Sequence, residues 1–229
     1  MKVEDDLDSS IERMTPTVRR LLLLRHGQTP YNAEARMQGQ LDIELTDLGR
    51  RQAKAAGAAL ADRDPLRIIS SDLQRAKDTA DAVGAATGVP VTTDVRLRET
   101  MLGEWQGKSH VEVDGYMPGS RARWRDAPTW APPGGESRLD VATRGLPLVD
   151  ELIAGLPEWG TSERPVILVA HGGLIAALTA RLLDLPLESW PVLGGLGNCS
   201  WVQVSGHGDG PRWRLDVWNA SSDVAHDVL

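Results

Sequence analysis

The sequence predicts an α/β protein in which helices cover both faces of a mostly parallel central sheet, forming a three-layer α/β/α sandwich. Short apolar runs near residues 19–25, 67–70 and 166–170 suit strands that are buried on both faces. Each run is followed, directly or after a loop, by a segment with apolar residues at helical spacing. Such alternation is typical of a parallel sheet, and 229 residues suit one domain with a substantial insertion.

The first half of the chain contributes two strand–helix pairs. A strand over residues 19–25 precedes a helix that begins after Thr46, a residue type that caps helix N-termini, and extends to Leu60. A second strand over residues 67–70 leads into a helix whose buried face carries apolar residues at 3-4-3 spacing, at Leu73, Ala76, Ala80 and Val83.

The second half begins with residues 103–135, which are rich in Gly, Pro and Trp and have no sustained period. We interpret this stretch as a lid-like insertion. A long helix is expected over residues 139–156, and Pro147 should kink or divide it, because proline lacks a backbone N–H. The remaining elements are expected to be a strand at 166–170, a helix at 173–183 and late strands at 201–204 and 213–218.

Composition restricts the partners and the location. The chain has 25 Lys and Arg against 32 Asp and Glu and lacks a basic cluster, which argues against nucleic acid as a partner. Its aliphatic runs are far shorter than the ~20 residues of a membrane helix, so we expect no membrane association. Residues 1–17 are predicted to be an acidic flexible tail preceding a single domain at 18–229. Cys199, the only cysteine, fits a reducing compartment, and we expect a cytoplasmic protein.

Histidines and arginines follow the predicted strands. Arg25 and His26 end the first strand, Arg75 lies one helical turn beyond the second, and His171 follows the run at 166–170. Ligands of parallel sheets bind at the carboxyl ends of the strands. A single histidine there is more often structural, but two, each followed by glycine and accompanied by arginines, favour a functional site.

These residue types suit phosphoryl chemistry. Arginine binds phosphate oxygens bidentately, and neutral imidazole is a competent nucleophile. A glycine such as Gly172 after the histidine lets backbone N–H groups approach an anion. The sequence has neither metal-ligand spacing nor a nucleotide-binding phosphate loop, so no metal and no cofactor are expected.

The order of motifs resembles the histidine phosphatase superfamily, also called phosphoglycerate mutase-like. The motifs are LLLLRHGQT (21–29), LTDLGRRQA (45–53), SSDLQRAKDTA (70–80), RLRETMLGEWQG (96–107), GGES (134–137) and VAHGG (169–173). The resemblance implies a phosphohistidine at His26, phosphate binding by Arg25, Arg75 and His171, and acid/base catalysis by Glu99. It also implies that Asn32 and Gln38 line the entrance to the site.

Several assignments have alternatives. Glu104, five residues beyond Glu99, is a rival acid/base carboxylate, and Gln28 and Thr29 either contact phosphate or cap the following turn. The remaining histidines, His110, His207 and His226, are interpreted as structural or exposed. Three tryptophans of the insertion are expected in a core, with a sugar or acyl pocket as the alternative: Trp105, Trp124 and Trp130.

A finer resemblance concerns the substrate. RMQGQLDIELT (36–46), APPGGES (131–137) and WPVLGGLGNCSW (190–201) are similar to a branch of the family that dephosphorylates glucosyl-3-phosphoglycerate in polysaccharide biosynthesis. Pro30, where relatives often carry an acidic residue, departs from this pattern. The alternatives are a phosphoglycerate mutase-type phosphotransferase, a broad-specificity sugar-phosphate phosphatase and a non-catalytic phosphate-binding module. The expected partner is a small anionic phosphomonoester, and a homodimer is one possibility.

Overall fold

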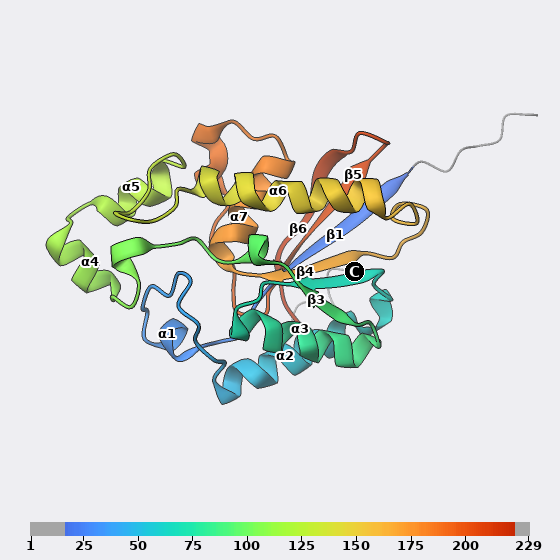
Figure 1. Cartoon of the computed structure of the whole chain (residues 1–229), viewed down its shortest axis with the longest axis horizontal. Coiled ribbons are helices and arrows are strands. Elements are labelled where there is room, and N and C mark those ends of the chain that lie inside the picture. The colour runs from blue at the N-terminus through green and yellow to red at the C-terminus, as the bar shows by residue number, and fades with distance from the viewer. Residues whose placement is uncertain (1–16, 223–229) are drawn as a thin grey trace, which may run out of the picture.

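The computed structural model describes residues 17–222. Its sheet has six strands in the order β3-β2-β4-β1-β5-β6 (Figure 1). The strands are β1 (Val18–Arg25), β2 (Arg67–Ser70), β3 (Val91–Thr93), β4 (Val166–Ala170), β5 (Trp201–His207) and β6 (Arg212–Ala220). The first four run parallel to one another, whereas β5 is antiparallel to both β1 and β6. The mostly parallel sheet predicted from the sequence is therefore confirmed.

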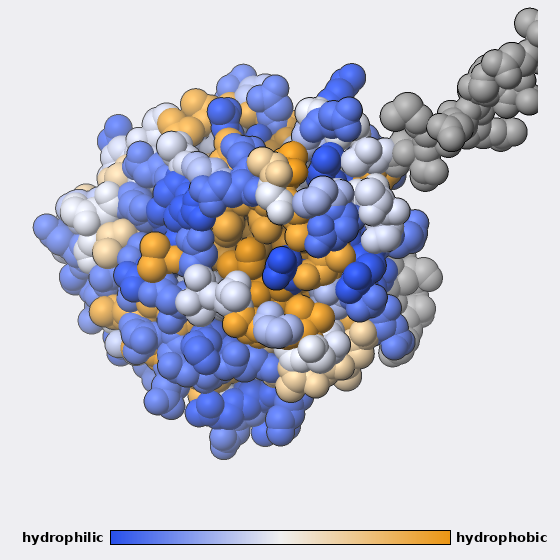
Figure 2. Space-filling view, turned by 45° about the vertical axis from the view of Figure 1, so that its right-hand side comes forward, coloured by the Kyte–Doolittle hydropathy of each residue, from blue (hydrophilic) through white to orange (hydrophobic). Residues whose placement is uncertain are grey.

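Helices cover both faces of this sheet, with α2 (Asp47–Leu60) and α3 (Gln74–Thr87) below it and α6 (Arg138–Gly155) and α7 (Gly172–Leu182) above it (Figure 1). Successive side chains of β1 alternate between the two layers. Leu21 and Leu23 pack with α6 and α7, whereas Leu22 and Leu24 pack with α2 and α3. Hydrophilic residues dominate the face shown in Figure 2, and hydrophobic ones gather in its hollowed centre.

Shorter elements complete the described chain. They are the helices α1 (Pro30–Ala33), α4 (His110–Tyr116) and α5 (Ser120–Asp126), and the 3-10 turns Ala61–Arg63, Val95–Leu97, Gly103–Trp105 and Leu187–Val192. The predicted insertion forms α4 and α5, which lie together at one end of the molecule (Figure 1). It has a small core of its own around the fully buried Trp105, against which Trp124 and Trp130 pack. For Trp105, the expectation of core packing is confirmed.

The expected division of the long helix at Pro147 is wrong, because α6 is one continuous helix of 18 residues. Pro147 lies on the exposed side of α6, as does Thr143, whose carbonyl loses its helical partner at the proline. Water can bind a carbonyl on that side, and the buried Leu148 and Val149 keep the next turn against the sheet. The acidic tail predicted for residues 1–17 lies outside the described residues except for Thr17. In the described part of the chain, no helix is long and apolar enough to cross a membrane.

Candidate active site

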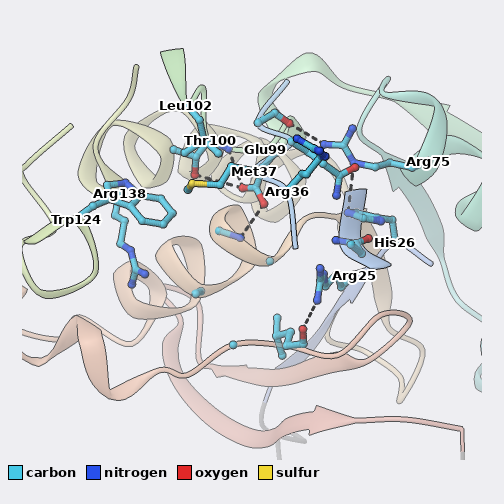
Figure 3. Close-up of a pocket in the computed structure, with 18 of the residues that line it drawn as sticks. Arg25, His26, Arg36, Met37, Arg75, Glu99, Thr100, Leu102, Trp124 and Arg138 are labelled. Atoms are coloured by element: carbon cyan, nitrogen blue, oxygen red, sulfur yellow. Dashed lines mark hydrogen bonds between the residues drawn. The ribbon is translucent and has the colours of Figure 1, made fainter. Parts of the chain in front are cut away.

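A cavity of about 400 Å³ lies at the carboxyl ends of β1 and β4, between the sheet and the insertion. Four of the five residues predicted for phosphate binding and acid/base or nucleophilic catalysis line it: Arg25, His26, Arg75 and Glu99 (Figure 3). They come from β1, from the loop after β1, from α3 and from the loop after the Val95–Leu97 turn. The topology thus brings together residues separated by up to 74 positions.

His26 is buried and held in one tautomer. Its Nδ1 lies 2.7 Å from the carbonyl oxygen of Gly27, which can only accept, so Nδ1 carries the proton. Its Nε2 therefore has a free electron pair and accepts from Arg75 Nε at 3.3 Å. Burial, reinforced by the charges of Arg75 and Arg25, holds the pKa of His26 well below its usual value of 6.5. His26 is accordingly a neutral imidazole with a nucleophilic nitrogen directed at the arginines.

Among residues 17–222, no carboxylate lies within salt-bridge distance of the two arginines beside His26. Arg75 is fully buried and donates to the backbone carbonyls of Leu41 and Gly39 at 2.7 and 2.8 Å. Burial lowers the pKa of Arg75 to about 10, which leaves it charged at neutral pH. Arg25 donates to the carbonyl of Leu196, and its Nε is buried without a hydrogen-bond partner among residues 17–222. Such guanidinium groups favour binding of an anion at this point.

His171 is fully buried beside His26 and is not itself among the residues that line the cavity. Its ring lies 5.1 Å from that of His26, between centroids, and both of its nitrogens lack partners in the described part of the chain. Burial holds the pKa of His171 well below 6.5. His171 also precedes the first turn of α7, where the backbone N–H groups of Gly173 and Leu174 donate to Glu99. Unpaired ring nitrogens at a helix N-terminus suit a tetrahedral oxyanion.

Glu99 is fixed by the start of α7. Its Oε1 accepts from the backbone N–H groups of Thr100 at 2.7 Å and Leu174 at 3.1 Å, and its Oε2 accepts from Gly173 N at 3.0 Å. A Cβ on Gly173 would lie 2.5 Å from Glu99 Oε1, so only glycine allows this approach. The rival carboxylate Glu104 is exposed and does not line the cavity. Geometry thus favours Glu99.

The other sequence-predicted residues divide into two groups. Asn32, Gln38 and Gly172 line the cavity. Gln28 and Thr29 do not, so direct phosphate contact by these two is not supported. Thr29 is fully buried and caps α1, and Gln28 accepts from Thr46, the cap of α2. The capping interpretation therefore fits Thr29, whereas Gln28 contacts the cap of a different helix.

Gly27 serves a different purpose from the one expected for a glycine after histidine. Its N–H donates to Thr79 Oγ1 at 3.1 Å and is not available to an anion. A Cβ at this position would lie 2.5 Å from the carbonyl oxygen of Gly49, so glycine is required for close packing of β1's end against α2.

Three lining residues with charged or titratable side chains were not assigned to the site from the sequence: Arg36, His110 and Arg138. His110 is exposed, as expected, and it lies on the cavity wall. For Trp124 the core and pocket interpretations both apply, because its ring packs on Trp105 and also lines the cavity. These residues line the cavity only because of how the insertion packs on the rest of the domain. No local sequence motif predicts that packing.

Comparison with known proteins identifies the family to which the chain belongs. A model of the histidine phosphatase superfamily (branch 1) matches residues 21–221. The chain belongs to this superfamily. It is 64% identical over 223 residues to the glucosyl-3-phosphoglycerate phosphatase of Mycolicibacterium vanbaalenii, covering 93% of this chain and 99% of the relative. A protein of the same name from Mycobacterium tuberculosis is 60% identical over 220 residues, with 92% and 99% covered.

Solved structures of this superfamily are similar over nearly the whole domain. The mycobacterial glucosyl-3-phosphoglycerate phosphatase in complex with VO3 has a TM-score of 0.87 and 62% identity, covering 89% of this chain and 100% of its own. The complex of that enzyme with inorganic phosphate has a TM-score of 0.86 and 60% identity, covering 90% and 99%. At greater distance, phosphoglycerate mutase-like protein 4 of Arabidopsis thaliana is 34% identical over 211 residues, covering 90% and 86%.

Proposed function

We propose that this protein is a phosphomonoester hydrolase that works through phosphohistidine at His26 and converts glucosyl-3-phosphoglycerate to glucosylglycerate and phosphate. The observation that carries the reaction type is the neutral, tautomerically fixed His26 beside Arg25, Arg75 and His171. Support for the substrate comes from the relatives of that name, at 64% and 60% identity over more than nine-tenths of this chain.

In the first step, His26 Nε2 attacks phosphorus, an N–P bond forms and the bond from phosphorus to the leaving oxygen breaks. Arg25 and Arg75 donate to the non-bridging oxygens, and His171 Nε2 or Nδ1 supplies a further donor. Glu99 transfers its proton to the departing alkoxide. Its Oε2 accepts from Gly173 N alone, whereas Oε1 accepts from two backbone N–H groups, so Oε2 is the oxygen with room for the proton.

In the second step, water attacks the phosphohistidine, the N–P bond breaks and His26 regains its electron pair. Glu99, now a carboxylate, takes the proton of that water and returns to its starting form. The carbonyl of Glu99 accepts from Gln40 and from Arg144, at 3.0 and 2.8 Å, which keeps the carboxyl in place through both steps.

Local cations account for anion binding by an acidic protein. Each unit charge about 4 Å from the phosphate contributes on the order of 4 kcal/mol at an effective dielectric constant near 20. Distant surface carboxylates are screened over a Debye length of about 8 Å at physiological salt. Arg25 and Arg75 therefore outweigh the net charge of −7.

Phosphate release from a panel of esters tests the proposal. The panel contains glucosyl-3-phosphoglycerate, mannosyl-3-phosphoglycerate, 3-phosphoglycerate and simple sugar phosphates. We expect the highest kcat/KM with glucosyl-3-phosphoglycerate. Equal rates on all sugar phosphates would instead support a broad-specificity phosphatase, and absence of any turnover, including that of p-nitrophenyl phosphate, would support a binding module. A cytoplasmic location belongs to the proposal and is supported by the single cysteine, which is unpaired in the structure.

A phosphoglycerate mutase activity is the second candidate, because relatives at 33–34% identity are named probable phosphoglycerate mutase, including that of Salmonella paratyphi C. A mutase needs a phosphohistidine that outlives product exchange. Stimulation by bisphosphoglycerate, with interconversion of 2- and 3-phosphoglycerate faster than phosphate release, would favour it over the hydrolase.

A further inference from the structure

Arg138 is an unpaired cation in the cavity, away from His26. It occupies the first position of α6, and Figure 3 shows Glu99 between the Arg138–Trp124 pair and His26. Its side chain is half-buried, and its Nε is buried without a hydrogen-bond partner. Among residues 17–222, no carboxylate lies within salt-bridge distance of Arg138 and no hydrogen bond from its guanidinium is found. Leaving a buried charged donor unpaired is unfavourable, so this group is suited to a ligand.

Two neighbouring arginines, in contrast, are hydrogen-bonded to carboxylates of the protein. Arg36, which also lines the cavity, donates to Glu34 at 2.8 Å and to the carbonyl of Gly107 at 3.1 Å. Arg144, two turns along α6, donates to both oxygens of Glu136. Arg36 and Arg144 are therefore paired with carboxylates of the protein itself. The guanidinium group of Arg138 has no such partner among the described residues and lines the cavity.

Trp124 holds the Arg138 side chain in place. The guanidinium carbon lies 5.2 Å from the centroid of the Trp124 ring, and that ring packs edge-on against the fully buried Trp105. Burial lowers the pKa of Arg138, and the charge of Glu99 opposes that shift. A guanidinium nevertheless keeps its proton in proteins. Arg138 is therefore a fixed, permanently charged fork.

We propose that Arg138 binds the carboxylate of the acid part of the substrate while Arg25 and Arg75 bind its phosphate. A planar guanidinium matches a carboxylate bidentately. The need for such a cation follows from Glu99, since this group becomes a carboxylate on giving its proton to the leaving oxygen, and it would then repel the carboxylate of an acidic leaving group beside it. The inference rests on the proposed function in one respect, that a phosphomonoester is held at His26. According to this inference, Arg138 is the residue that selects phosphate esters carrying a carboxylate over phosphate esters without one.

The test compares two esters that differ at one group. 3-Phosphoglycerate has a carboxylate where glycerol 3-phosphate has a hydroxymethyl group. In Arg138→Gln we expect kcat/KM for 3-phosphoglycerate and for glucosyl-3-phosphoglycerate to fall about 10- to 100-fold, mainly through KM. For glycerol 3-phosphate the fall should be no more than about threefold. Arg138→Lys, which keeps the charge but not the fork, should recover part of the preference.

Arg123→Gln is the matched control. Arg123 also lies over a tryptophan, 5.5 Å from the centroid of the Trp130 ring, but it lines a separate surface cavity. This variant should keep the wild-type preference for 3-phosphoglycerate. If Arg123→Gln lost that preference as Arg138→Gln does, the loss would be explained by a general effect of surface charge and not by a contact between Arg138 and the carboxylate.

Two results in Arg138→Gln would overturn the inference: an equal loss on 3-phosphoglycerate and glycerol 3-phosphate, or no loss on either. The first would indicate a structural role for Arg138. Calorimetric titration of both esters in a His26→Ala background makes the same comparison without turnover. Loss of the binding preference there upholds the inference even if glucosyl-3-phosphoglycerate proves not to be a substrate, so the two proposals fail separately.

Discussion

Replacing Glu99 by glutamine removes the transferable proton and keeps the shape of the side chain. The structure adds a local cost, because both carboxyl oxygens accept backbone N–H groups, from Thr100 and Leu174 at Oε1 and from Gly173 at Oε2. An amide has one oxygen, so one of the two sets of donors must face its NH2 group. Leaving a partly buried backbone N–H without an acceptor costs about 1–3 kcal/mol of stability.

The kinetic effect should depend on the leaving group. General acid–base catalysis contributes typically 10²- to 10⁴-fold, so we expect kcat of Glu99→Gln on phosphoglycerate-type substrates to fall by that order. On p-nitrophenyl phosphate the loss should be much smaller when phosphorylation limits the rate, because p-nitrophenolate departs without a proton. Steady-state kinetics on both substrates measure the difference, and urea unfolding measures the loss of stability.

Glu104→Gln is the matched control, because Glu104 is exposed and outside the cavity lining. It should behave as wild type on both substrates. The assignment would be refuted if Glu104→Gln showed the leaving-group-dependent defect and Glu99→Gln did not, or if Glu99→Gln lost the same factor on both substrates.

Three further results are expected. Gly173→Ala, whose Cβ would lie 2.5 Å from Glu99 Oε1, should lower kcat roughly tenfold or more on phosphoglycerate-type substrates by displacing that carboxyl. Gly194→Ala, with open space on the same cavity, should not; equal defects would contradict this reasoning. Chelator should leave activity unchanged, since no cluster of metal ligands occurs within residues 17–222, and loss restored by magnesium would disprove it. Because the folded-state pKa values of His26 and His171 lie below 6.5, the unfolded chain binds more protons below that pH. The free energy of unfolding should therefore fall below pH 6.5 by up to about 1.4 kcal/mol per pH unit per histidine. Urea unfolding at pH 7.5 and 5.5 measures this fall, and His26→Asn should reduce it.

The central strands β1 and β4 could be predicted, because they carry apolar runs that are buried on both faces. The run at Val166–Ala170 is a clear case, since every residue of β4 is buried. The lid could be recognised only as irregular, because its small core around Trp105 draws on Met37, far away in the sequence. Pro147 shows a further limit: a local rule about proline was overridden by burial of the neighbouring residues.

The phosphate end of the site was predictable for a similar reason. Arg25 ends β1, and His26 and His171 directly follow β1 and β4, so the parallel pairing of these strands places all three at one edge of the sheet. Arg138 could not be predicted, because it reaches the cavity from the start of α6 and lies over Trp124 from the insertion. That contact joins two segments whose relative position depends on tertiary packing.

Trapping of the covalent intermediate tests the central claim most directly. Wild-type protein mixed briefly with phosphate-labelled substrate and quenched in alkali should carry label on His26 that is stable to base and released by acid. His26→Ala should show neither label nor turnover. Label on another residue, or retained turnover in His26→Ala, would contradict the phosphohistidine mechanism.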